Sequence, residues 1–149
     1  MNAIREMGYI AVGVGKTEFA IEIDKVLGEY ALQKQQPPYI LAGNLIGAGL
    51  TREQRFPAPP GANRPLIDQV ETTRVGQMSV GVSAVVGKSI VEEVKKGNLD
   101  PSVDFGNNAV VLKGVVQDLT AKKSQLNILL YQGTSEEAAA VATAWSVPP

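Results

Sequence analysis

The chain has 149 residues, 44% hydrophobic and 19% charged, which suits one globular domain with a buried core. Its 14 basic and 15 acidic side chains give a net charge of −1, so no broad positive field is present to attract nucleic acid. It contains no histidine and no cysteine, which excludes disulfides, thiolate nucleophiles, histidine-dependent triads and metal sites built on either residue.

The first predicted element is a half-buried strand over residues 8–15, where Ile10, Val12 and Val14 alternate. Residues 17–32 are ambiguous, because their apolar side chains fit both a strand and a helical spacing. We interpret them as a strand through Asp24, followed by a helical turn that ends before Pro37.

The middle of the chain predicts one buried strand and one long loop. Residues 39–46 are short, apolar and bounded by proline and glycine, which is typical of a buried strand. Residues 47–65 show no periodicity and are rich in proline and glycine, so we expect an extended arm there.

The second half predicts three strands and two helices. Strand character covers residues 66–82, 108–119 and 126–131. A helix is predicted over residues 83–96, where valine and isoleucine recur every four residues and Gly97 follows as a helix-ending residue. The last helix opens with a capping box, Thr134 and Glu137, and runs to about Trp145.

This order predicts an α+β fold in a single domain, residues 1–149. We expect a mostly antiparallel or mixed sheet, two helices on one face and a long extended Pro/Gly/Arg loop at about 47–65.

The segment Gly13-Val-Gly-Lys-Thr17 is similar to the end of a phosphate-binding P-loop. The required earlier glycine is replaced by Ile10, so we interpret the segment as a glycine turn between two strands. If a ligand pocket exists, Lys16 and Asp24, with Lys88, are the candidates to line it. Carboxylates remain available for a cation, but the spacing at Asp100 and Asp104 lacks the glycine and the terminal glutamate of an EF-hand loop. We expect no metal and no cofactor.

Four of the five arginines lie between positions 52 and 74, on and beside the predicted arm. Arginine is favoured at interfaces because its planar guanidinium makes bidentate contacts. An exposed surface loop explains the same pattern equally well. The candidate interface comprises Arg52, Arg55, Phe56, Arg64 and Arg74.

Two segments resemble the formaldehyde-activating enzymes: Gly13-Val-Gly-Lys16 with Glu22-Ile-Asp24, and the helix end Val91–Gly97. That family's activity is associated with a histidine, which this chain lacks. The resemblance therefore implies a relative without that activity.

Residues 1–8 carry no continuous apolar region of the kind found in signal peptides, and the apolar stretch 39–50 is too short and glycine-rich to span a bilayer. We therefore expect a soluble protein of the cytoplasm or of a virion, with no membrane partner.

Together these features favour a non-enzymatic structural or assembly protein that forms a homo-oligomer, such as a viral or phage particle component. Its expected partners are copies of itself and other particle subunits, and nucleic acid is not expected. The alternative is a small-molecule-binding domain, or a lyase or transferase that uses no histidine. A third hypothesis is a regulatory protein that binds another chain through the arm.

Overall fold

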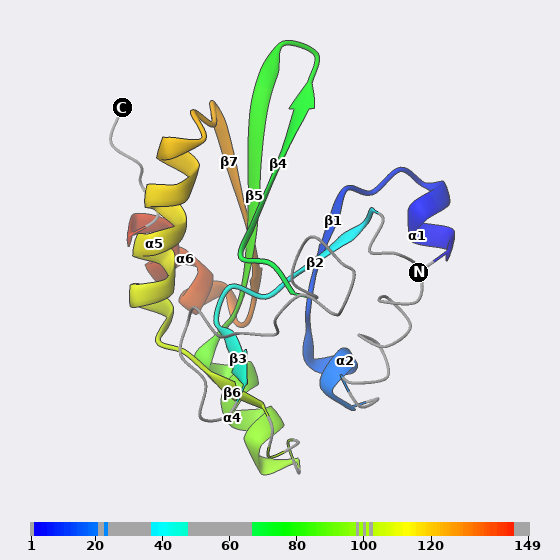
Figure 1. Cartoon of the computed structure of the whole chain (residues 1–149). Coiled ribbons are helices and arrows are strands. Elements are labelled where there is room, and N and C mark those ends of the chain that lie inside the picture. The colour runs from blue at the N-terminus through cyan, green and yellow to red at the C-terminus, as the bar shows by residue number, and fades with distance from the viewer. Residues whose placement is uncertain are drawn as a thin grey trace.

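The structure is a computed structural model, and it describes residues 2–20, 23, 37–47, 67–97, 99, 101 and 103–144. Its first elements are α1 (Asn2–Glu6), β1 (Ala11–Gly13), α2 (Lys16–Ala20), β2 (Tyr39–Leu41), β3 (Leu45–Gly47), β4 (Val70–Val75) and β5 (Met78–Val86). Then follow α4 (Lys88–Lys96), β6 (Val103–Phe105), α5 (Asn108–Ala121), β7 (Leu126–Gln132) and α6 (Ser135–Ala144). Figure 1 shows their arrangement.

The largest sheet has the order β4-β5-β7 and is mixed, because β4 and β5 run antiparallel while β5 and β7 run parallel. The β4–β5 hairpin closes between Val75 and Met78, and Gly76 adopts the positive φ of 62° that such short turns favour. Two further pairs complete the pattern, with β1 parallel to β2 and β3 antiparallel to β6. The predicted α+β fold class is confirmed.

Two hydrophobic clusters form the core. One lies between the three-stranded sheet and helices α5 and α6, which cover one face of it (Figure 1). Its members are Val70, Val85, Val111, Leu112, Val115 and Leu119, with Leu129, Tyr131 and Val141 packed against them. The other cluster lies where the chain before residue 48 packs against Ile67 and β6. It comprises Val14, Ile23, Ile40, Ala42, Leu45, Ile67 and Val103.

Strand β1 packs closely on the opposite face of the large sheet. A Cβ added at Gly13 would lie 3.2 Å from Ala84 Cβ and 3.6 Å from Leu130 Cβ, so only a small residue lets the strand approach this far. This contact fixes where the chain emerges toward α2.

Residues 108–119, predicted as a strand, form helix α5 instead. Asn107 caps this helix by accepting hydrogen bonds from the N–H groups of Ala109 and Val110. The residues that α5 buries, from Val111 to Leu119, recur with helical spacing, and this outweighs the strand preference of valine.

Three other boundaries differ from the prediction. Residues 17–20, predicted as the start of a strand, lie in helix α2 instead. The helix predicted over 83–96 begins at Lys88, because residues 83–86 continue β5 and pair with β7. The buried strand predicted over 39–46 is interrupted by a turn, which divides it into β2 and β3. The strands predicted at 8–15 and 126–131 are confirmed, the first within the shorter bounds of β1.

The turn between β2 and β3 is tied to the end of β5 by Asn44, whose side chain is 1% exposed. Its Oδ1 accepts a hydrogen bond from Val86 N at 2.9 Å, and its Nδ2 donates to Val86 O at 2.8 Å and to Asn108 Oδ1 at 2.7 Å. One buried amide therefore joins β5, α5 and the β2–β3 turn.

Helix α4 has no side-chain cap from its own N-cap residue, Gly87. Glu137 of α6 takes that role, accepting hydrogen bonds from Ser89 N at 2.9 Å and Ser89 Oγ at 2.7 Å. The same carboxylate accepts from Thr134 N, while Glu137 N donates to Thr134 Oγ1, so the predicted capping box is confirmed. The Ser89 hydroxyl, above all, lowers the pKa of Glu137.

Candidate binding pocket

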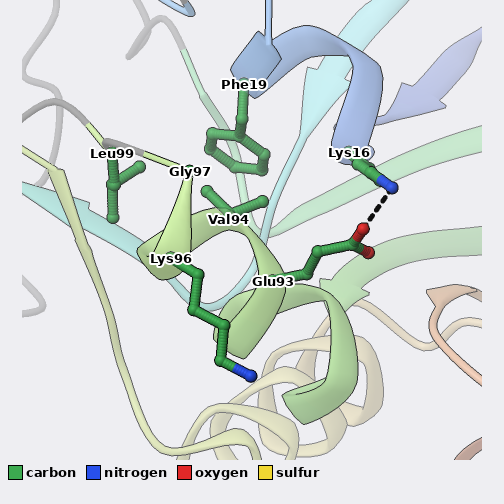
Figure 2. Close-up of a pocket in the computed structure, with 7 residues that line it drawn as sticks. All are labelled: Lys16, Phe19, Glu93, Val94, Lys96, Gly97 and Leu99. Atoms are coloured by element: carbon green, nitrogen blue, oxygen red, sulfur yellow. Dashed lines mark hydrogen bonds and ion pairs between the residues drawn. The ribbon is translucent and has the colours of Figure 1, made fainter.

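A pocket of about 320 Å³ lies between helices α2 and α4. Figure 2 shows the side chains that surround it, with Lys16 and Phe19 descending from α2 and Glu93 and Val94 rising from α4. Further lining residues lie at the C-terminal end of α4 and just beyond it, namely Lys96, Gly97 and Leu99.

Helix α2 begins directly after the glycine-containing turn because of a local carboxylate contact. Gly15 N donates to Glu18 Oε2 at 2.8 Å, which is the backward half of a capping box. The turn thus joins a strand to a helix, and the prediction of a turn between two strands is wrong. The Glu18 carboxylate thus takes the N–H that a P-loop would direct at a phosphate.

One wall of the pocket is apolar. Val94 is 8% exposed, and the Phe19 ring packs edge-on against Phe105 with centroids 5.4 Å apart and an interplanar angle of 65°. Phe19, Phe105 and Leu99 all border the core cluster around Val14, so this wall is anchored in the interior. Such a wall suits a flat or apolar part of a ligand.

The other side of the pocket is charged. Lys16 Nζ forms an ion pair with Glu93 Oε1 (Figure 2). Lys95 is engaged outside the lining, at 3.0 Å from Asp104 Oδ1, and the Phe105 N–H and then Lys95 lower the pKa of that carboxyl. Lys96 has no ion-pair partner among the described residues. Among the described residues, the lining therefore includes two lysines and one glutamate.

A second hollow of about 310 Å³ lies at the N-terminal ends of α4 and α5. It is lined by Lys88, by the asparagines at positions 44, 107 and 108, and by Val86, Val91, Phe105, Gly106 and Ala109. The amide of Asn108 is committed to the structure, since it contacts Val86 O and Asn44. Lys88 is 83% exposed and lies 3.7 Å from Glu92.

The predicted ligand residues are thus only partly placed. Lys16 lines the α2–α4 pocket, while Lys88 borders the other hollow. Asp24 lies outside the described residues. No sequence pattern selected Phe19, Glu93 or Lys96, because the two helices meet only in the fold.

Most of the predicted arginine interface falls outside the described residues, namely Arg52, Arg55, Phe56 and Arg64. The same holds for residues 48–65 of the predicted arm and for Trp145. Arg74 is described, and it is an exposed residue of β4 paired in register with Ser79. The arginine interface remains a prediction.

No family model matches this chain, and no curated protein does. Solved structures do match its fold. The 5'-nucleotidase precursor from Thermus thermophilus is 18% identical with a TM-score of 0.60, over 86% of this chain and 22% of that one. Haemophilus influenzae NAD nucleotidase is 16% identical with a TM-score of 0.63, over 94% of this chain and 25% of that one.

A third match is a putative 5'-nucleotidase from Staphylococcus aureus, solved in complex with alpha-ketoglutarate. It is 14% identical with a TM-score of 0.55, over 91% of this chain and 23% of that one. The chain therefore shares a fold with part of these nucleotidases, and it spans a quarter of their length or less.

These matches correct the functional expectation from the sequence. The predicted non-enzymatic structural or assembly protein, with a viral or phage particle component as its concrete form, is wrong, because the fold is that found in nucleotidases. The resemblance to formaldehyde-activating enzymes is likewise not supported by any family match. Among the described residues, no helix has both the length and the apolar character needed to cross a membrane.

Proposed function

We propose that this chain binds a nucleotide-type ligand, with the α2–α4 pocket as its site. The observation that carries the proposal is the lining, which combines the Phe19 ring and Leu99 with two lysines, Lys16 and Lys96. A nucleotide has the matching parts, since its base is flat and its phosphate is anionic. The fold shared with nucleotidases supports this class of ligand over other anions.

The proposal concerns binding rather than phosphate cleavage. The chain has no histidine or cysteine, and the described residues offer no group of three or more acidic side chains placed to hold a metal ion. Since the chain corresponds to a quarter or less of each nucleotidase, the activity in their names is not carried over to it.

Calorimetric titration with adenosine 5′-monophosphate tests the proposal. We expect saturable binding that weakens about thirtyfold in the double variant Lys16→Gln, Lys96→Gln, because each lost charge contact to phosphate removes on the order of 1 kcal/mol. Lys113→Gln, on the exposed side of α5, is the matched control and leaves the affinity unchanged. No binding to the wild-type chain, or equal weakening in the control, contradicts the proposal.

The apolar wall is tested separately with Phe19→Leu. This change keeps an apolar side chain but removes the flat ring, so it is expected to weaken adenosine and adenosine 5′-monophosphate by the same factor. A loss of affinity for adenosine 5′-monophosphate alone would show that the base does not bind against Phe19.

A further inference from the structure

The Lys16–Glu93 ion pair joins the two helices that form the pocket, across 77 positions of sequence. In Figure 2 the two side chains point at each other from opposite sides of the pocket. The pair is exposed, at 56% for Lys16 and 52% for Glu93. Exposed pairs of this kind contribute at most about 1 kcal/mol, so a stronger anion can replace one partner.

The Glu93 carboxylate occupies the place on Lys16 that a ligand phosphate would take. Within the described residues no second cation compensates Glu93, since Lys95 is turned to Asp104 and Lys96 forms no ion pair with it. A phosphate that approached Lys16 would therefore both displace Glu93 and remain near its negative charge. An uncharged ligand bound against Phe19 would do neither.

We infer that Glu93 is a specificity-determining residue, an internal competitor that sets how strongly the pocket holds the charged group of its ligand. This inference rests on the proposed function of the pocket. It makes Lys16 the phosphate contact for which Glu93 competes, so the affinity of the pocket depends on the charge of the ligand through Glu93.

The test compares three ligands that share one base: adenosine, which is uncharged, cyclic adenosine 3′,5′-monophosphate, a monoanion, and adenosine 5′-monophosphate, close to a dianion at about pH 7.5. Removing one carboxylate about 5 Å from the phosphate in Glu93→Gln is expected to raise affinity about fourfold for the dianion and about twofold for the monoanion, after screening by salt. Adenosine affinity is expected to stay the same.

Glu92→Gln is the matched control, because Glu92 lies on the same helix, is exposed and does not line the pocket. It changes the net charge of the chain by the same amount. A graded response to ligand charge in Glu93→Gln alone supports the inference, since a change in folding or packing would affect all three ligands alike.

Two results overturn it in distinguishable ways. The wild-type chain could bind the nucleotide while Glu93→Gln has the same affinities as Glu92→Gln, or raises the affinity for adenosine as much as that for the nucleotides. In either case Glu93 sets no specificity and the proposed function stands. If neither the wild-type chain nor Glu93→Gln binds any of the three ligands, the proposed function fails and the inference fails with it.

Discussion

Replacing Asn44 by alanine tests whether one buried amide holds the β2–β3 turn to the sheet. The change leaves Val86 N without its acceptor, while Val86 O keeps the Asn108 Nδ2 contact at 3.1 Å. An orphaned buried donor costs about 1–3 kcal/mol. The lost side-chain volume, roughly 40 Å³ at about 24 cal/mol per Å³, adds about 1 kcal/mol.

The expected loss for Asn44→Ala is therefore about 3 kcal/mol in the free energy of unfolding. At about 3 °C per kcal/mol for a chain of this size, Tm should fall by roughly 10 °C. Urea unfolding followed by circular dichroism measures the first quantity, and a thermal scan measures the second.

Asn127→Val is the matched control, in strand β7 of the sheet that Asn44 contacts. The Asn127 Oδ1 is buried and has no hydrogen-bond partner among the described residues, so replacing this oxygen with a methyl group breaks no hydrogen bond at that atom. We expect this variant to be neutral or slightly stabilised, because β7 favours a β-branched residue. A loss under about 1 kcal/mol for Asn44→Ala, or an equal loss in both variants, would refute the reasoning.

Three further predictions concern the helices that position the pocket. Gly87→Ala should lower the free energy of unfolding by about 2–3 kcal/mol, because the added Cβ would lie 2.7 Å from Glu137 Oε2 and 2.8 Å from Gln132 O. Gly97→Ala should be tolerated in the same denaturation assay, because the nearest atoms of the described residues lie 3.6 Å from its added Cβ. The pKa of Glu137 is lowered in the folded chain, so the carboxylate stabilises the fold fully above its ordinary pKa of 4.5, and this contribution is lost as the pH falls through the folded pKa. The free energy of unfolding, measured from about pH 7 to about pH 3, should therefore fall less steeply in Glu137→Gln than in the wild-type chain. An unchanged slope would contradict this role. Thr134→Ala removes the hydroxyl that accepts from Glu137 N and should cost about 1 kcal/mol, and a Tm equal to that of the wild-type chain would show that the capping box contributes nothing.

The fold class was predictable from the sequence because it depends on local patterns. The capping box at Thr134 and the strand β7 each depend on a pattern of a few neighbouring residues. Helix α5 was missed because its valines favour strands locally, while its identity as a helix depends on which of them face the sheet. Tertiary packing decided that element.

The pocket was harder to predict than the fold. The glycine-rich segment around Lys16 indicates this lysine as a ligand candidate by its similarity to a P-loop. In the structure Lys16 lines the pocket for another reason, because the turn leads into α2 and the Gly15 N–H donates to Glu18. In the sequence, Glu93 and Lys96 have the spacing of the solvent-exposed face of an amphipathic helix. Only the packing of α2 on α4 brings them into one pocket. No local spacing could have revealed that contact.

The central claim, that a nucleotide binds between α2 and α4, is tested most directly by nuclear magnetic resonance. Amide shifts of the ¹⁵N-labelled chain would be followed during titration with adenosine 5′-monophosphate. We expect saturable shifts concentrated at the pocket lining, Lys16, Phe19, Glu93, Val94, Lys96, Gly97 and Leu99. Shifts centred on the hollow around Lys88, or no saturable shifts at all, would contradict it.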